Sequence, residues 1–306
     1  MNINNDNLIL INALIDYLKT MPDQIDSKTL ENVKASGVSE LYAYASLLNS
    51  YMGLDESYID RYLLNMIRKE DISKYTNDPF YQAMNLDKQK IGNLEIDYSY
   101  IEAYELYALD EIDKYLDGRI YPQVGYSEDF LKCLTIIDGS KTLYSFNPLC
   151  INANIIPLEQ IKGKVAIFGA GNGYFAFMAN AKEDVESIMI YESNEDLIKL
   201  FTKCMLPKFK YPEKVKVIKA DPYLFLKNKT SKLTANYAYI NCWEDIKSAV
   251  KDYPKYKKLE SIRPKIKYLY YLEESIYNYP SEASDENSWF FAKSWRYKDY
   301  PRWWNV

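Results

Sequence analysis

The feature that most constrains the fold is a regular alternation of short apolar runs and helix-like segments between residues 163 and 271. Continuous apolar runs indicate strands that are buried on both faces, and the segments between them are long enough to cross the sheet as helices. This alternation predicts an α/β fold with a parallel, doubly wound sheet. We expect strands at 165–168, 187–191, 215–219, 237–241 and 266–271, and helices at 173–181, 194–205, 222–227 and 244–251.

The N-terminal half has a different pattern. Residues 7 to about 71 predict helices, because apolar side chains recur there at helical spacing. Residues 90–145 contain shorter runs that are typical of strands. Asn147-Pro148 suits a helix start, with Asn as the N-cap and Pro in the first helical position. We therefore expect a helical plus small β domain over 1–146, and an α/β domain with an aromatic C-terminal tail over 147–306.

Composition excludes several classes of function. The 306 residues include no histidine, which rules out Ser-His-Asp and Cys-His catalysis and the common zinc sites. The four cysteines form no CxxC pair, so we expect no metal site. The 38 basic and 43 acidic residues give a net charge of −5, which argues against a nucleic-acid partner held by a basic surface. No secretory or membrane-spanning apolar run is visible, and a cytoplasmic protein is expected.

Three glycines stand within five residues directly after the first predicted strand of the α/β half. The chain has only ten glycines, and Gly169, Gly171 and Gly173 fall where strand gives way to helix. Glycine lets the main chain turn tightly and approach a ligand, while the following helix N-terminus offers unpaired N–H groups. Together with Ala170 and Asn172, these residues form the predicted cradle for a nucleotide-like ligand.

Ligands of doubly wound sheets bind outside the carboxyl ends of the strands, so the residues after each strand are candidates for the site. Glu192 follows the second strand, where a carboxylate can accept hydrogen bonds from both ribose hydroxyls of an adenosine ligand or can cap the next helix. Asp221 follows the third strand, where it can bind an adenine amino group or act as the N-cap before Pro222. Asn241 follows the fourth strand and leads Trp243 toward the same edge.

These residues resemble class I S-adenosylmethionine-dependent methyltransferases, in particular uncharacterised bacterial members that are distantly similar to spermidine synthases. The resemblance extends from about Asp78 to Ile276 and is strongest over 165–176. It implies a Rossmann-like methyltransferase sheet with S-adenosylmethionine as the cofactor. It further implies that the glycine loop meets the methionine part, Glu192 the ribose and Asp221 the adenine.

The catalytic residues are less evident than the cofactor residues. Members of the family commonly carry an acid where the fourth strand ends, and this chain has Asn241 there. Glu244 or Asp245 would then supply any general base, with Trp243 as a wall of the site. Transfer from a sulfonium needs mainly positioning of the nucleophile and exclusion of water, which suits a site without histidine. The expected activity is methyl transfer to a small or medium-sized acceptor molecule.

Alternatives stay open at this point. The similarity to spermidine synthases allows transfer of an aminopropyl group to an amine, and Asn241 allows a non-catalytic sensor or assembly protein that binds an adenosine ligand. A dinucleotide-binding loop would read GxGxxG, and Tyr174 in the sixth position argues against it. The aromatic tail at 289–304 is expected to pack on its own domain or in a subunit interface. Self-association through this tail or through the N-terminal domain is therefore an open alternative.

Overall fold

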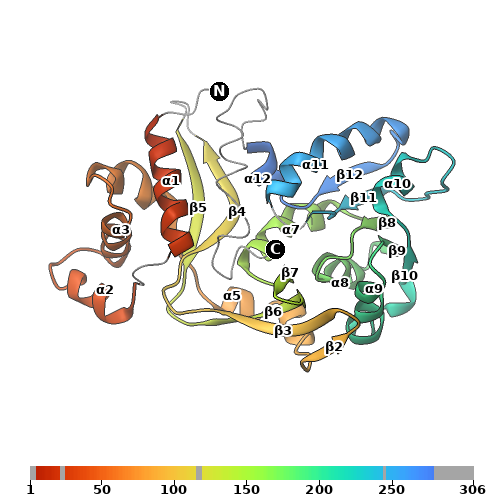
Figure 1. The fold of residues 1–306 in the computed structure, drawn as a ribbon, viewed down its shortest axis with the longest axis horizontal. Helices are drawn as coiled ribbons and strands as arrows, with labels where there is room; N and C mark the ends of the chain where they lie inside the picture. Colours follow the sequence, from red (N-terminus) through yellow and green to blue (C-terminus); the bar gives the residue numbers. More distant parts are fainter. Residues whose placement is uncertain (1–4, 21–24, 115–118, 244–245, 279–306) are drawn as a thin grey trace.

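The computed structural model describes residues 5–20, 25–114, 119–243 and 246–278, and it arranges them in three sheets with their covering helices (Figure 1). The helices are α1 (Asn5–Thr20), α2 (Ser27–Lys34), α3 (Glu40–Tyr51), α4 (Leu64–Met66), α5 (Ser73–Thr76), α6 (Pro79–Ala83), α7 (Pro148–Gln160), α8 (Tyr174–Ala181), α9 (Glu195–Leu200), α10 (Pro222–Lys227), α11 (Ile246–Leu259) and α12 (Glu273–Asn278). No helix within these described ranges is both long enough and apolar enough to cross a membrane.

The strands divide among the three sheets. They are β1 (Ile67–Lys69), β2 (Gln89–Ile91), β3 (Leu94–Ile101), β4 (Tyr107–Lys114), β5 (Ile120–Tyr126), β6 (Leu131–Asp138), β7 (Lys141–Ser145), β8 (Gly163–Phe168), β9 (Val185–Glu192), β10 (Val215–Lys219), β11 (Tyr237–Ile240) and β12 (Lys267–Tyr270). The orders are β1-β5-β4, β2-β3-β6-β7 and β10-β9-β8-β11-β12.

The predicted doubly wound sheet is confirmed. All five strands of the third sheet run parallel. When the strands are numbered 1 to 5 by their order along the chain, their spatial order across the sheet is 3-2-1-4-5. That order places the first strand, β8, at the centre, with Phe168 paired to Tyr191 of β9 on one side and to Ile240 of β11 on the other. Figure 1 shows α8 and α9 on one side of this sheet and α11 on the other. The carboxyl ends of β8 and β11 therefore form the switch point at which such folds bind ligands.

Apolar packing explains why β8 is central. Val165 to Phe168 are each at most 1% exposed. The Phe168 ring stacks on Tyr191 with centroids 4.8 Å apart, and Tyr239 of β11 stacks on Phe175 of α8 at 3.6 Å. Each fully buried large apolar side chain stabilises the fold by about 1.5–3 kcal/mol. The sheet is thus fixed directly beneath the glycine loop.

The N-terminal half differs from its prediction at one point. Helices were expected to about residue 71, whereas Ile67–Lys69 forms β1 and pairs in parallel with β5. Ile67 is β-branched and 3% exposed, and the Glu70 N–H continues the pairing by donating to the Tyr126 carbonyl at 2.8 Å. The edge of β5 that does not pair with β4 provides the partners for these hydrogen bonds. Because this pairing is between segments far apart in the sequence, the periodicity of residues 7–71 does not predict it.

The junction between the two halves begins as predicted. The Asn147 side chain accepts the Cys150 N–H at 2.8 Å, and Pro148 occupies the first turn of α7. Helix α7 packs against β4 of the N-terminal half and α8 of the α/β half. It therefore joins the sheets through packing contacts, while the division of the chain at residue 146 into two domains stays a prediction.

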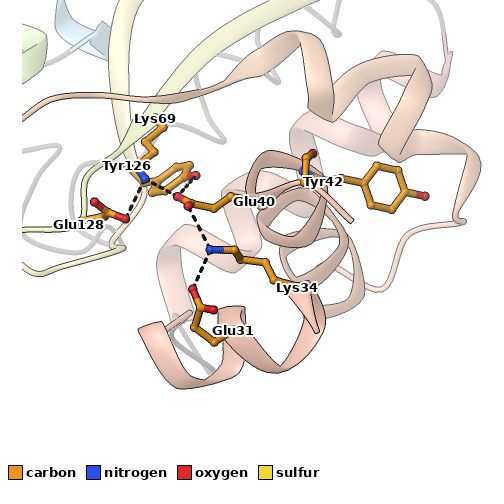
Figure 2. Close-up of polar contacts among 8 residues, drawn as sticks. Glu31, Lys34, Glu40, Tyr42, Lys69, Tyr126 and Glu128 are labelled. Atoms are coloured by element: carbon orange, nitrogen blue, oxygen red, sulfur yellow. Dashed lines mark hydrogen bonds and ion pairs between the residues drawn. The ribbon is translucent and has the colours of Figure 1, made fainter. Parts of the chain in front are cut away.

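A chain of alternating charges fastens the N-terminal helices to β1 and β5 (Figure 2). Glu40, in the first turn of α3, pairs with Lys69 at 2.7 Å and with Lys34 at 3.4 Å. The Tyr126 hydroxyl donates to the same carboxylate at 3.3 Å. The Lys69 ammonium is the main cause that lowers the pKa of the Glu40 carboxyl. The outer members of the chain are Glu31 and Glu128.

Replacing Glu40 by Gln should lower the free energy of unfolding by about 0.5–1 kcal/mol at neutral pH, because the pair is partly solvated and screened. The folded-state pKa of Glu40 is lowered. Its contribution is therefore present above the unfolded-state pKa and is lost as pH falls through the folded-state pKa. Urea unfolding from neutral pH down to about pH 3 should show the difference between wild type and variant shrinking with acid.

Glu31→Gln is the matched control, because the Glu31 side chain is 66% exposed and pairs only with Lys34 among the ion pairs of the described chain. Its effect should be smaller than that of Glu40→Gln. Equal effects of the two variants, or a Glu40 effect that does not change with pH, would contradict the central role of Glu40.

Candidate functional site

The glycine loop lies at the switch point of the parallel sheet. Gly169, Gly171 and Gly173 have φ values of +88°, +57° and +82°, in the left-handed region that favours glycine. A Cβ atom on Gly169 would overlap the carbonyl oxygen of Asn241, so only glycine lets the loop pass the end of β11. Gly173 precedes α8 and provides no side-chain cap. The first N–H groups of α8 are therefore left without a side-chain acceptor from the N-cap residue.

The acid after β9 is bound to this loop. Glu192 is 6% exposed, and its Oε2 atom accepts the Ala170 N–H at 2.9 Å. Its Oε1 atom accepts the N–H groups of Ser193 at 2.7 Å and Asn194 at 2.8 Å. The N-cap of α9 is Asn194, so the interpretation of Glu192 as a helix cap is wrong. The carboxylate positions the loop, and its remaining lone pairs are the ones that ribose hydroxyls can use.

Asp221 is the exposed N-cap residue of α10. Its Oδ1 atom accepts the Leu224 N–H at 2.8 Å, and Pro222 follows in the first turn of α10. The capping alternative is therefore present in the structure. The side chain is exposed, and its second oxygen is not used by the cap. Contact between this oxygen and an adenine amino group stays a prediction.

The residues after β11 contact the end of β8. The Asn241 N–H and the Cys242 thiol both donate to the Phe168 carbonyl, at 2.8 Å and 3.0 Å. Burial, with smaller contributions from the carboxylates of Glu192 and Asp221, raises the pKa of the Cys242 thiol to about 12. Both carboxylates therefore favour the protonated form of the Cys242 thiol. A protonated thiol is a poor nucleophile. Across the described residues, no group of three or more Cys, Asp or Glu side chains is placed to hold a metal.

Asn172, predicted to bind the cofactor, holds the loop against the N-terminal half. Its Nδ2 atom donates to the Ser145 carbonyl at 3.0 Å and lies 3.2 Å from the Cys150 sulfur. Its Oδ1 atom accepts the Tyr174 N–H at 3.1 Å. The Tyr174 side chain turns toward α6, where its hydroxyl donates to Asp78 at 3.0 Å. Both side chains therefore anchor the start of α8.

A cavity of about 10 Å³ lies at this edge of the sheet, between the glycine loop and the ends of β11 and β12. Two of its lining groups, Asn241 Oδ1 and the Tyr271 hydroxyl, are buried without a hydrogen-bond partner in the described part of the chain. A buried polar group without a partner costs about 1–3 kcal/mol. A space of this size holds about one water molecule or one polar ligand atom. These two groups would therefore gain most from a bound molecule.

Trp243 lies in the core beside this cavity. Its ring is 2% exposed and parallel to that of Tyr270 within 7°, with centroids 6.2 Å apart. Its indole N–H donates to the Tyr271 carbonyl at 3.2 Å. Glu244 and Asp245 lie outside the described residues. Catalytic roles for all three residues stay predictions.

Tyr271 is the site residue that the sequence pattern hides. It follows β12 directly, whereas the strand predicted from sequence extends to residue 271 and includes it. If the predicted strand had ended at residue 270, Tyr271 would have been the residue after the strand and therefore a candidate for the site. Asn154 and Tyr144 also line the cavity, and they come from α7 and β7. No local signal connects those elements to the strand ends.

No family model matches the sequence, and no curated protein matches it significantly by sequence. Solved structures show distant similarity in fold. Spermidine synthase from Thermotoga maritima matches 72% of this chain and 66% of its own, with 13% identity and a TM-score of 0.36. Wild-type Trm5b from Pyrococcus abyssi matches 40% of this chain and 34% of its own, with 15% identity and a TM-score of 0.28. MNMC2 from Aquifex aeolicus matches 65% of this chain and 62% of its own, with 14% identity and a TM-score of 0.23. The chain thus spans under two thirds of each protein's length, and these similarities assign no activity.

Alanine substitutions at three glycines should separate backbone strain from steric overlap. Gly139, Gly171 and Gly169 all have positive φ, but an added Cβ meets nothing within 4 Å at Gly139, the Asn241 amide at Gly171 and the Asn241 main chain at Gly169. We expect Gly139→Ala to cost about 1–2 kcal/mol of stability from left-handed strain alone. Gly171→Ala should cost more and Gly169→Ala most, as measured by urea unfolding.

The same substitutions in an Asn241→Ala background supply the control. Removing the amide should cancel the additional cost at Gly171 but not at Gly169, because the overlap at Gly169 is with main-chain atoms. Equal costs at all three glycines, or no rescue at Gly171, would contradict the described loop geometry.

Proposed function

We propose that this protein is an S-adenosylmethionine-dependent transferase, with its site along the glycine loop at the carboxyl ends of β8, β9 and β11. The observation that carries the proposal is the hydrogen bond from the Ala170 N–H to Glu192. It places a buried carboxylate beside a glycine loop at the switch point of a doubly wound sheet. Nucleotide ligands of this fold class bind at such a point, with an acid on the ribose.

The residues around the loop suit the parts of that cofactor. Glu192 would hold the ribose hydroxyls, and Asp221 the adenine amino group. The loop from Gly169 to Gly173 would accommodate the methionine part, because its glycines leave the main chain accessible. Asn241 and Tyr271 offer the two buried polar atoms that have no partner in the described chain, and they would meet the reacting end. When bound, the cofactor supplies a methyl group activated by a sulfonium.

The described side chains favour transfer by positioning. Cys242 is protonated, and the chain has no histidine, so neither type of residue supplies a base or nucleophile here. Most of the residues that line the small cavity at the strand ends are buried, which limits the access of water to it. An acceptor that is already deprotonated needs only orientation and a dry site. Methyl transfer to such a small molecule is therefore the reaction that we propose.

Calorimetric titration with S-adenosylmethionine, its decarboxylated form and NAD tests the class of ligand. The proposal expects S-adenosylmethionine to bind and methyl-labelled cofactor to pass label to a component of a metabolite extract. Preference for the decarboxylated form would indicate aminopropyl transfer. Tight binding without any label transfer would indicate a sensor, and preference for NAD would overturn the proposal.

The ribose contact can be tested without changing the protein. S-adenosylhomocysteine analogues that lack the 2′- or the 3′-hydroxyl should each bind more weakly, by about 1.5–3 kcal/mol, because each loses a hydrogen bond to a charged carboxylate. Calorimetry on the wild-type chain measures the difference. Analogues that bind as well as the parent compound would show that Glu192 only holds the loop.

Tyr271→Phe should separate a functional hydroxyl from a structural one. The Tyr271 hydroxyl has no partner in the described chain, so its removal should leave stability unchanged or slightly raised. Label transfer should fall about tenfold or more, equivalent to ~1.4 kcal/mol of transition-state stabilisation. The measurements are urea unfolding and initial rates of label transfer.

Tyr239→Phe provides the comparison, because the Tyr239 hydroxyl donates to Asn154 at 2.6 Å. That variant should lose about 1 kcal/mol of stability. Unchanged transfer by Tyr271→Phe would place the Tyr271 hydroxyl away from the reacting end.

A further inference from the structure

A second cavity, of about 330 Å³, lies between α6 and the face of the N-terminal sheet that β3 and β6 present. Its volume is within the range of small-molecule sites, which begins at about 300 Å³. It shares no lining residue with the cavity at the strand ends. The proposed transferase site therefore does not account for it.

Both walls of this cavity are held in place by contacts outside it. The rings of Phe80 and Phe146 lie 5.1 Å apart, and each packs on Tyr174 at 5.4 Å. On the opposite wall, the Tyr98 hydroxyl donates to the Leu86 carbonyl at 2.6 Å and accepts the Leu86 N–H at 2.9 Å. The cavity is consequently preformed, and an occupant need not order its walls.

The charge on the lining has one sign. Lys132 places its Nζ atom 3.7 Å from the centroid of the Tyr98 ring, and no carboxylate lines the cavity. Asp97, adjacent to Tyr98 in sequence, pairs with Lys88 instead. In the part of the chain that the structure describes, Lys132 forms no ion pair. A cation that no carboxylate neutralises in this lining favours an anionic occupant.

Neutral polar residues line the same cavity. They include Tyr81 and Asn85, whose side chains make no hydrogen bond within the described ranges. Burial raises the pKa of Tyr81, so its hydroxyl remains a donor at neutral pH. The half-buried rings of Tyr81 and Tyr98 offer aromatic surface to the cavity, whereas Phe80, Leu134 and Phe146 are at most 4% exposed. A cation and neutral donors in one cavity suit a carboxylate, and the two tyrosine rings suit a flat hydrocarbon body.

We propose that this cavity binds a small aromatic carboxylic acid, with its carboxylate on Lys132 and its ring against the rings of Tyr81 and Tyr98. The site is separate from the glycine loop. Its occupancy does not depend on whether the protein transfers a methyl group.

Benzoate is the probe, with benzamide as its neutral equivalent of the same shape and inorganic phosphate as an anion without an apolar body. Chemical-shift titration of the full chain should show saturable binding of benzoate, and binding of the other two should be about tenfold weaker or less detectable, a difference of ~1.4 kcal/mol. Equal binding of benzamide would overturn the role of the cation. Equal binding of phosphate would overturn the role of the tyrosine rings.

Three variants locate the site. Lys132→Met removes the charge and keeps the length of the side chain, and it should weaken benzoate binding about tenfold, or ~1.4 kcal/mol. Lys90→Met, at an exposed position of β2 in the same sheet, is the matched control and should leave binding unchanged. Asn85→Trp, at an exposed position of the cavity lining, should block entry without altering charge. Circular dichroism confirms that each variant is folded. Absence of saturable benzoate binding, or binding that Lys132→Met and Asn85→Trp leave unchanged, would overturn the proposal.

Discussion

The absence of a side chain at Gly169 is the constraint on which the candidate site depends. The loop after β8 and the main chain after β11 approach so closely that a single added carbon on Gly169 would overlap the Asn241 carbonyl oxygen. This close approach brings the loop, Glu192 and the end of β11 to one edge of the sheet. The Ala170–Glu192 hydrogen bond then fixes the loop from its other side. The geometry of the edge is therefore set by main-chain packing before any ligand is considered.

The α/β half could be predicted from sequence because its signals are local. Short strand-like runs mark the strands, and the structure reproduces the strand at 215–219 with the same limits. The N-cap at Asn147 and the glycine turn at 169–173 also depend on neighbouring residues alone. The fold class follows from the alternation of these elements along the chain, whereas the strand order comes from the structure. For that reason the cradle was identifiable without coordinates.

The remaining features depend on contacts between distant segments. Ile67–Lys69 becomes a strand because β5 lies beside it, and Asn172 faces Ser145 because α7 and α8 pack together. The two unpartnered atoms of Asn241 and Tyr271 acquire significance only when β11 and β12 stand side by side. Tertiary context decides such features, and periodicity carries no information on them. The 31 tyrosines of the chain include large core side chains such as Tyr44 and Tyr239.

The hydrogen bond between Tyr174 and Asp78 has a consequence for the order in which the molecule folds. The two residues are 96 positions apart, and Phe80, two residues after Asp78, packs on Phe146, Tyr174 and Phe177. The start of α8 is thus completed by a segment that is synthesised long before it. The loop that such a contact closes carries a high entropic cost, so its formation is slower than that of contacts between neighbouring segments. An isolated α/β half would therefore lack the Asp78 partner of Tyr174 and the Phe80 ring that packs on α8.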